Sequence, residues 1–286
     1  MLYSDADSQM LALIEGFKKG MALIRPIELV ELPSERETLR KQLQELNKAK
    51  PALVVALGTR AAMVARELLT DTPVLFTYAV DTQTTQLRGP RMRGINYTIR
   101  AQEQIAMLRK IYPGMRRVGV VYNPSNSGFE VNWMEEAARE AGVAMFKFKV
   151  DVDQDVERAL ANLAGKVEML WVPDDPMILK SDNLRELLRF SLRESTPLYT
   201  FNPVHVNAGA SISLSPSGHA AGLQLAEMAS RVLLGSPIEQ LPMEWPKNYE
   251  LGINLAILKR IGRLEDVAVN ALVFAAEEKH DVKVVR

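Results

Sequence analysis

Short apolar runs alternate with amphipathic stretches along most of the chain. Runs rich in Val, Leu and Phe are typical of strands buried on both faces, and helices between such strands are typical of β–α–β units. The pattern therefore predicts an α/β fold with parallel sheets covered by helices on both faces. The predicted strands are residues 27–32, 52–57, 73–80, 117–122, 144–150, 168–172 and 197–201.

The amphipathic stretches predict helices, and several carry start or stop signals. Ser34 followed by Glu37 has the spacing of a capping box, Asp182 precedes another helix, and Gly235 with Pro237 ends a third. The predicted helices are residues 10–23, 34–49, 60–69, 101–111, 129–141, 156–163, 183–195 and 222–234, with a helical tail from 254 to about 279.

Two segments indicate that the chain consists of two similar halves. Residues 52–59 and 117–124 each end a buried strand in a small polar loop before a helix. The pattern breaks near residues 94–99 and 207–217, where we expect the chain to cross between lobes. A chain of 286 residues is long enough to bury two cores.

Composition narrows the classes of function. Lys plus Arg equals Asp plus Glu at 35 each, so no net field attracts nucleic acid, and the cluster Arg88, Arg91 and Arg93 is interpreted as a solvated loop. Cysteine is absent from the sequence, which excludes disulfides and thiolate metal sites. No apolar run of the sequence approaches the ~20 residues that span a bilayer.

Motifs for cofactor chemistry or catalysis are not found in the sequence. It contains no G-x-G-x-x-G motif, and Gly58-Thr59 lacks the Gly-Lys-Ser/Thr of a phosphate loop. No two of its three histidines have the i, i+4 spacing of a helical zinc site. A Ser-His-Asp triad drawn from Ser213, His205 or His219, and Asp174 has no nucleophile elbow, so polar loop histidines are the simpler interpretation. We expect no cofactor, no metal and no catalysis.

Candidate ligand contacts lie at the ends of predicted strands, where open α/β sheets bind ligands. Asp174 and Asp175 follow the strand 168–172, and Asp174 fits equally well as the cap of the next helix. Trp171, in the middle of its strand, is interpreted as a core residue. Tyr78, Tyr122 and Phe201 fit either a pocket wall or the core.

Seven motifs in order resemble the ABC transporter substrate-binding family linked to tryptophan and tyrosine uptake. They are Ala-Leu-Val-Val-Ala-Leu-Gly-Thr ending at Thr59, Pro-Val-Leu-Phe ending at Phe76, Gly-Ile-Asn-Tyr-Thr ending at Thr98, Val-Gly-Val-Val-Tyr-Asn-Pro ending at Pro124, Val-Pro-Asp ending at Asp174, Val-Asn-Ala-Gly-Ala ending at Ala210, and Leu-Gly-Ile-Asn ending at Asn254. The resemblance covers nearly the whole chain.

The resemblance implies a type I periplasmic-binding-protein fold. Such a fold has two flavodoxin-like, Rossmann-type lobes with parallel sheets, joined by a three-crossing hinge that closes on a ligand. The N-terminal lobe is expected to comprise residues 1–97 plus 217–243, and the C-terminal lobe residues 98–216 plus 244–286. Where the family commonly reads Asn-Val-Thr-Gly at the first crossing, this chain has Asn96-Tyr97-Thr98-Ile99, which is expected to change hinge freedom or cleft shape.

The resemblance also implies a set of ligand contacts for a small amino-acid-like ligand, and the family suggests an aromatic one. The ligand carboxylate is assigned to the backbone after Gly58 and the hydroxyl of Thr59, where a helix dipole favours an anion, and the ammonium group to Asp174. The other expected contacts are Tyr3, Ser4, Asp5, Thr77, Tyr78, Asn96, Tyr122, Asn123 and Phe201.

For partners and location, the resemblance implies an ABC permease in the membrane and a monomeric protein that is periplasmic, or extracellular and lipid-anchored. Only Leu2 and Tyr3 precede Ser4, although the fold expects a longer apolar strand there, so we expect the sequence to begin downstream of a removed export segment. Two alternatives stay open. One is a sensor that signals to a partner protein through the same cleft, and the other is an enzyme of flavodoxin-like architecture.

Overall fold

The computed structural model describes residues 1–286 except 4–6, 23–26, 34, 70, 80–86 and 88. The chain divides into two compact units: unit 1 is Met1–Thr98 with Pro216–Asn248, and unit 2 is Ile99–Ser215 with Tyr249–Arg286. The chain therefore passes between the units at three places. Residues 244–248, predicted to lie in the second lobe, belong to unit 1, as do Thr98 and Pro216. For residues 244–248, Glu244 explains the difference, because its backbone exchanges hydrogen bonds of 2.9 Å with Gly94 and Asn96.

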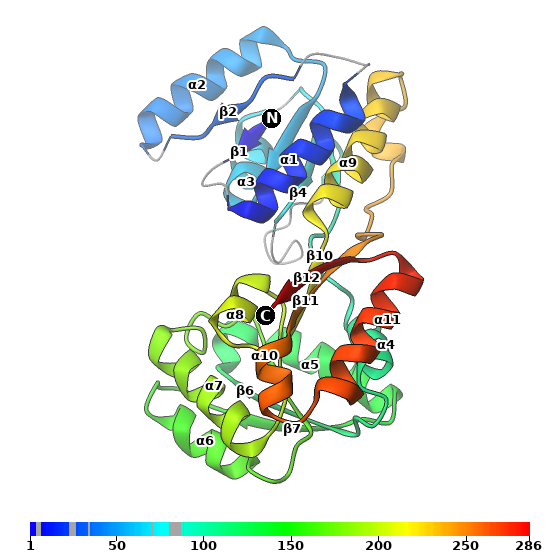
Figure 1. Cartoon of the computed structure of the whole chain (residues 1–286). Helices are drawn as coiled ribbons and strands as arrows, with labels where there is room; N and C mark the ends of the chain where they lie inside the picture. Colours follow the sequence, from blue (N-terminus) through cyan, green and yellow to red (C-terminus); the bar gives the residue numbers. More distant parts are fainter. Residues whose placement is uncertain (4–6, 23–26, 34, 70, 80–86, 88) are drawn as a thin grey trace. The chain divides into compact units, whose positions relative to one another are not determined.

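Unit 1 is built on a five-stranded sheet in the order β2-β1-β3-β4-β5, in which every adjacent pair is parallel (Figure 1). Its strands are β1 (Leu2–Tyr3), β2 (Val30–Glu31), β3 (Val54–Leu57), β4 (Val74–Thr77) and β5 (Met92–Gly94). Its helices are α1 (Ser8–Met21), α2 (Arg36–Ala49), α3 (Thr59–Leu68), α9 (Gly218–Leu233) and the short 3-10 helix Ile238–Gln240.

Two apolar layers cover the two faces of this sheet. In β3, Val55 and Leu57 pack with α1 and α9, whereas Val54 and Ala56 pack with α2 and α3. Helices α1 and α9 approach so closely that a Cβ atom on Gly222 would lie 2.1 Å from the carbonyl oxygen of Leu13. Only glycine allows this approach, since any side chain would overlap the backbone of α1.

Unit 2 is built on a seven-stranded sheet in the order β12-β11-β10-β9-β8-β6-β7. Its strands are β6 (Arg117–Tyr122), β7 (Ala144–Lys149), β8 (Met169–Val172), β9 (Leu198–Thr200), β10 (Ile212–Pro216), β11 (Tyr249–Asn254) and β12 (Asp281–Val285). Its helices are α4 (Ala101–Ile111), α5 (Pro124–Glu140), α6 (Asp155–Leu163), α7 (Ser181–Glu194), α8 (Pro203–Ala208), α10 (Leu255–Arg260), a π-helical turn (Leu264–Ala268) and α11 (Val269–Glu278).

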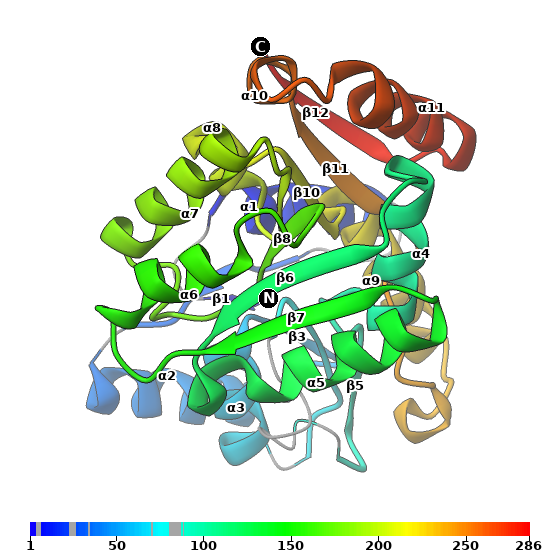
Figure 2. The same ribbon diagram turned by 90° about the horizontal axis from the view of Figure 1, so that it is seen from below.

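Figure 2 shows α4, α5 and α11 along one face of this sheet and α6, α7 and α8 along the other. The buried residues agree with this layering. In β8, Met169 and Trp171 pack on the side of α4 and α5, and Leu170 and Val172 pack on the side of α6 and α7. The prediction that Trp171 is a core residue is confirmed, since it is 2% exposed.

Four strands and one α-helix were not predicted as such. Most of β5 lies in the segment interpreted as a solvated basic loop, and β10 and the first half of β11 lie where crossings between the lobes were expected. Strand β12 follows the predicted helical tail, and α8 lies in a segment for which the sequence predicts a loop. Strand β12 lies at the sheet edge, and only Val285 of its residues is not exposed, so it lacks the apolar run of a buried strand. The tail is not one helix, because it is interrupted after α10 at Gly262, whose φ is +70°.

The sheet of unit 2 is not parallel throughout. Adjacent strands from β6 to β10 are parallel, but Asn254 N–H donates to Ser211 O and Ser217 N–H donates to Asn248 O, so β11 runs antiparallel to β10. Strand β12 then pairs in parallel with β11. The predicted α/β class with two lobes is correct, and the reversal of the last two strands is a feature that the apolar pattern did not indicate.

Arg93 does not belong to a solvated loop. Its guanidinium donates to the carbonyl oxygens of Leu241 at 2.8 Å and Glu239 at 2.8 Å, and also to that of Gly89. It therefore holds β5 to the segment after α9. Arg91 donates to Asp71 O at 2.6 Å, and Arg88 lies outside the described residues.

Each sheet contains a point where the strand order reverses. In unit 1 the chain leaves β1 for β2 on one side and then continues with β3 on the other, and in unit 2 it leaves β6 for β7 and continues with β8. In open α/β sheets the crevice at the carboxyl ends of such a strand pair is where ligands bind. We call these places the β1/β3 switch point and the β6/β8 switch point.

Candidate functional site at the two switch points

At the β1/β3 switch point, the start of α3 depends on Gly58. This residue has φ 91° and ψ 158°, a conformation that other residues rarely adopt. Its N–H donates to Thr77 O at 3.0 Å and its carbonyl accepts from Ala62 N–H at 3.0 Å. Because the N-cap residue is a glycine, it has no side chain with which to cap α3, and the first turn of this helix contains no acidic residue. The positive end of the α3 dipole is therefore not offset by a carboxylate of its own first turn.

Asp7 and Tyr78 form the second feature of unit 1. The carboxylate of Asp7 caps α1 by accepting from Met10 N–H at 2.9 Å, and its other oxygen accepts from the Tyr78 hydroxyl at 2.6 Å. Burial and the Asp7 carboxylate raise the pKa of Tyr78 above its usual range, so the hydroxyl stays a donor. Tyr78 has φ 59°, and its ring packs against Tyr97 with the centroids 4.6 Å apart. A bulky residue in the left-handed region stores strain, which is a common property of binding sites.

At the β6/β8 switch point, the loop between β6 and α5 is held internally. The side chain of Asn123 caps α5 by accepting from Ser125 N–H at 2.9 Å and also donates to Val150 O at 3.0 Å. Tyr122 is 2% exposed and belongs to the core that contains Val131 and Met134 of α5. Both side chains support the loop from inside unit 2.

Asp175 connects this loop to the loop after β8. It is fully buried and accepts five hydrogen bonds, from the backbone N–H groups of Asn123, Met177 and Ile178 and from the side chains of Asn126 and Ser127. Asp174, in contrast, is exposed. The alternative that Asp174 caps the next helix is wrong, because the N-cap of α7 is Lys180 and no side chain caps that helix. The N–H groups of Met177 and Ile178 donate to Asp175.

Glu130 is a further acidic residue at this switch point, and sequence reasoning missed it. It is half-buried on α5, and its carboxylate accepts from Asp174 N–H at 3.3 Å. Burial, with the nearby Asp174 carboxylate, raises the pKa of Glu130 from 4.5 to about 7. Although the residue is exposed, partial desolvation of its carboxylate and the charge of Asp175 also raise the pKa of Asp174. The sequence signal was weak, because Glu130 is an ordinary helix residue until the fold places it beside the β8 loop.

The remaining predicted contacts divide between surface and interior. Thr77 is fully buried and donates to Ile95 O at 3.1 Å, and Asn96 N–H donates to Glu244 O at 2.9 Å. Tyr3, at the end of β1, and Phe201, which follows β9, are half-buried. Ser4 and Asp5 lie outside the described residues. The structure thus brings Tyr3, Gly58 and Thr59 to the switch point of unit 1 and Asn123 and Asp174 to that of unit 2.

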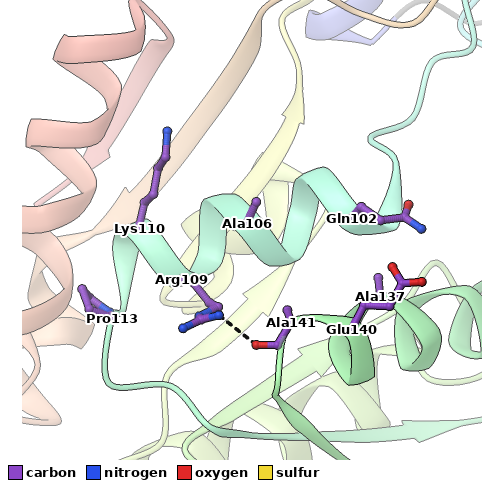
Figure 3. A pocket seen from close by; sticks show the side chains of 8 residues that line it. All are labelled: Gln102, Ala106, Arg109, Lys110, Pro113, Ala137, Glu140 and Ala141. Carbon is purple, nitrogen blue, oxygen red and sulfur yellow. Dashed lines mark hydrogen bonds between the residues drawn. The ribbon is translucent and has the colours of Figure 1, made fainter.

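A groove of about 500 Å³ lies elsewhere on unit 2, between α4 and the end of α5 (Figure 3). Ala106, Ala137 and Ala141 line it, and the Arg109 guanidinium at its side donates to Ala141 O at 2.8 Å. None of its lining residues belongs to a strand-to-helix loop of a switch point. We therefore do not assign the ligand to this groove. Among the described residues, no group of three or more His, Cys, Asp and Glu side chains is placed to hold a metal ion.

The chain belongs to the family of ABC transporter substrate-binding proteins, whose sequence profile matches residues 9–278. It is similar to the tyrosine-binding protein of Clostridioides difficile strain R20291, with 21% identity over 255 residues that cover 86% of this chain and 73% of that protein. The resemblance to this family is thereby confirmed. The family is one of binding proteins that serve ABC transporters and is not an enzyme family, and its members are typically periplasmic or extracellular.

Solved structures show the same fold. One is a ligand-free, open structure of a substrate-binding protein with adhesive properties from Clostridium difficile, with a TM-score of 0.84 and 19% identity, covering 100% of this chain and 98% of that one. Another is an ABC domain in complex with L-Trp from Streptococcus pneumonia, with a TM-score of 0.66 and 20% identity, covering 99% of each chain. The predicted type I periplasmic-binding-protein fold is confirmed. No helix within the described ranges is long and apolar enough to cross a bilayer.

Proposed function

We propose that this protein binds an amino acid at the two switch points and delivers it to the membrane permease of an ABC importer without catalysing a reaction. One observation carries the proposal: the start of α3 in unit 1 offers N–H groups to an anion, whereas the loop after β8 in unit 2 offers carboxylates to a cation. Unit 1 presents a helix end without a carboxylate in its first turn, and unit 2 presents the carboxylates of Asp174 and Glu130. An amino acid carries one charge of each sign, which matches this pair of sites.

The proposed orientation follows from the electrostatics. The ligand carboxylate binds the backbone N–H groups and the Thr59 hydroxyl at the start of α3, because the helix dipole favours an anion there. The ammonium group binds Asp174, with Glu130 beside it. The side chain of the ligand is assigned to the half-buried aromatic surfaces of Tyr3, Tyr78 and Phe201.

The other expected contacts do not touch the ligand directly in this proposal. Thr77, Tyr122 and Asn123 have side chains that are buried or hydrogen-bonded within their own units, so they hold the ligand-contacting loops in place. Asn96, whose backbone is bonded to Glu244, fixes the first crossing between the units.

Relatives support the ligand class. The C. difficile relative is named as a tyrosine-binding protein, and the S. pneumonia structure holds L-Trp. We extend this class of ligand to the present chain and propose that it acts outside the cytoplasmic membrane as a monomer, with a permease as its partner and lipid anchoring as one means of retention there. Nucleic acid has no part in the proposal.

Isothermal titration calorimetry against the common L-amino acids tests the proposal. We expect one-to-one binding of at least one of them with a Kd in the micromolar range or tighter, which corresponds to about −8 kcal/mol. Matched compounds that lack the carboxylate (tyramine) or the amino group (3-(4-hydroxyphenyl)propionate) should bind more weakly than L-tyrosine if L-tyrosine binds. Absence of binding by every amino acid, or equal binding of the truncated compounds, would contradict the proposal.

A further inference from the structure

We infer that Asp175 is a positioning residue that makes unit 2 bind the ammonium end of the ligand and not its carboxylate. It does so by occupying the start of α5 from inside the protein and by fixing the loop that carries Asp174. This inference rests on the proposed function, because it assigns a polarity to the site proposed above.

The contacts of Asp175 join the two loops of the β6/β8 switch point. One carboxylate oxygen accepts from Asn123 N–H at 2.7 Å and from the Ser127 hydroxyl at 2.7 Å, both in the loop and first turn of α5. The other oxygen accepts from the Asn126 amide at 3.0 Å and from Met177 N–H at 3.0 Å. The carboxylate therefore fastens the start of α5 to the segment after β8.

All these partners are donors, and this decides which form of the side chain fits. An ionised carboxylate only accepts hydrogen bonds, whereas a protonated acid or an amide also carries a donor that needs an acceptor. A buried charge is tolerated when its hydrogen bonds are made, and here five donors surround it. Asp175 thus places a fixed negative charge at the positive end of α5.

Occupation of this helix end has a consequence for ligand binding. In a βα unit the helix N-terminus is where an anionic group of a ligand binds. At α5 this position is already taken by Asp175 and by the side-chain cap of Asn123, so a ligand carboxylate is excluded from it. At α3 of unit 1 the N-cap is Gly58, and no side chain caps that helix.

Asp175 also determines where Asp174 lies. The N–H of Asp174 donates to Glu130 at 3.3 Å, and the N–H of Asp175 donates to Pro173 O at 2.9 Å, so the backbone on both sides of the exposed Asp174 carboxylate is held. The Asp174 carboxylate is consequently presented to solvent by a rigid loop. We expect its strength as an ammonium acceptor to depend on Asp175 although Asp175 itself does not touch the ligand.

The test compares the affinity for an amino acid with the affinity for the same compound without its amino group. L-tyrosine with 3-(4-hydroxyphenyl)propionate is the first pair, and the tightest-binding amino acid of the panel with its des-amino acid replaces it if L-tyrosine does not bind. In Asp175→Asn we expect the ratio of the two association constants to fall at least tenfold, mostly because the amino acid binds more weakly. The exposed Asp182→Asn, whose partner is Arg185 on the surface of α7, is the matched control and should leave the ratio unchanged.

The ratio separates positioning from a purely structural role. A variant that is only less stable loses affinity for both compounds equally once its folded fraction is accounted for, so an unchanged ratio in Asp175→Asn overturns the inference. If Asp175→Asn does not fold, Ser127→Ala decides, because it removes one donor at 2.7 Å and keeps the carboxylate. We expect at least a twofold fall in the ratio, and an unchanged ratio there also overturns the inference. Failure of the wild-type protein to bind any amino acid would instead contradict the proposed function.

Discussion

The two switch points share a strand order but differ in how their helices begin. In unit 1, β3 runs into α3 through Gly58, and no side chain caps α3. In unit 2, β6 runs into α5 through Asn123, which caps the helix, and the buried Asp175 accepts from the same turn. The same topology thus produces an end suited to an anion in one unit and an end already occupied by a carboxylate in the other. The difference is made by a few residues in the loops and not by the fold.

The largest predicted effect is a loss of stability of unit 1, caused by a substitution where α1 contacts α9. In Gly222→Val, the new Cβ would lie 2.1 Å from the Leu13 carbonyl oxygen and 2.7 Å from the Phe17 nitrogen, so the two helices must separate. We expect a loss of about 4 kcal/mol in the free energy of unfolding of unit 1. Urea unfolding followed by tryptophan fluorescence measures this loss. Trp245 reports on unit 1, whereas Trp133 and Trp171 report on unit 2.

A glycine on α5 provides the control for this prediction. A Cβ on Gly128 would meet only Pro124 Cβ at 3.8 Å within a 4 Å radius. Gly128→Ala should therefore leave unit 2 unchanged or raise its stability by up to about 1 kcal/mol, since alanine favours a helix over glycine. A Gly222→Val protein that unfolds like the wild type would show that α1 and α9 do not pack as described.

The second prediction removes the special conformation at the start of α3. Gly58→Ala places a side chain at φ 91°, where the nearest atom is Met10 Cε at 3.6 Å, so the cost comes from backbone strain and not from a clash. We expect about 1–3 kcal/mol of destabilisation and a loss of ligand affinity of roughly tenfold. Calorimetric titration and thermal unfolding measure the two effects.

Gly142→Ala is the matched control for that change. Gly142 also has a positive φ, +70°, with no other atom within 4 Å of its ideal Cβ, but it follows α5 and does not belong to a switch-point loop. The Gly142→Ala substitution should lower the free energy of unfolding to a comparable degree, while the affinity for ligand stays the same. Equal losses of affinity in both variants would show that strain in general, and not the start of α3, limits binding.

The third prediction concerns pH and belongs to unit 2. The pKa of Glu130 is raised from 4.5 to about 7, so the folded protein holds this proton more tightly than the unfolded chain does. The stabilisation is complete below about pH 4.5 and is lost as pH rises through about 7. Because Glu130 is half-buried, solvent screening limits the effect to about 1–2 kcal/mol.

Glu130→Gln isolates this contribution. Burial lowers the pKa of His205 and of His280, and those residues change stability in the opposite direction as pH falls. The free energies of unfolding of wild type and Glu130→Gln are measured by chemical unfolding from pH 5 to pH 8. The contributions of the two histidines cancel in the difference between the two proteins. Ligand binding should release a proton near pH 7 in the wild type and not in the variant, as measured by calorimetry in buffers of different ionisation enthalpy. A difference that does not change with pH would contradict the assignment.

The smallest predicted effect concerns the hydroxyl group of Tyr78 in unit 1. Tyr78→Phe removes the hydroxyl that donates to Asp7 at 2.6 Å but keeps the ring against Tyr97. We expect a loss of about 1 kcal/mol in stability and a change of a few fold in affinity. Tyr199→Phe, which removes a buried hydrogen bond of 2.7 Å to Gln104 in the core of unit 2, should lower stability without changing affinity. A larger loss of affinity in Tyr199→Phe than in Tyr78→Phe would indicate that the Tyr78 side chain is not part of the site.

Most of the secondary structure was predictable because two-sided burial leaves a clear pattern. The runs in β3, β6 and β8 are apolar at every buried position, and α4 was predicted with the same bounds that the structure gives it. Strands β5 and β12 were missed because neither contains an uninterrupted apolar run. Arg93 in β5 and Lys283 in β12 break the apolar pattern, although both strands are held by backbone hydrogen bonds.

By itself, the sequence determined the α/β class, the two lobes and the family, because these depend on periodicity and on motifs that lie within short segments. It also placed Gly58 and Asp174 at the ends of strands. The tertiary structure alone decided that Asp175 is buried among donors from two loops, that Glu130 lies beside Asp174, and that Asn123 is engaged within unit 2. The physical reason is that burial and hydrogen bonding between segments some 50 residues apart depend on which strands become neighbours in the sheet.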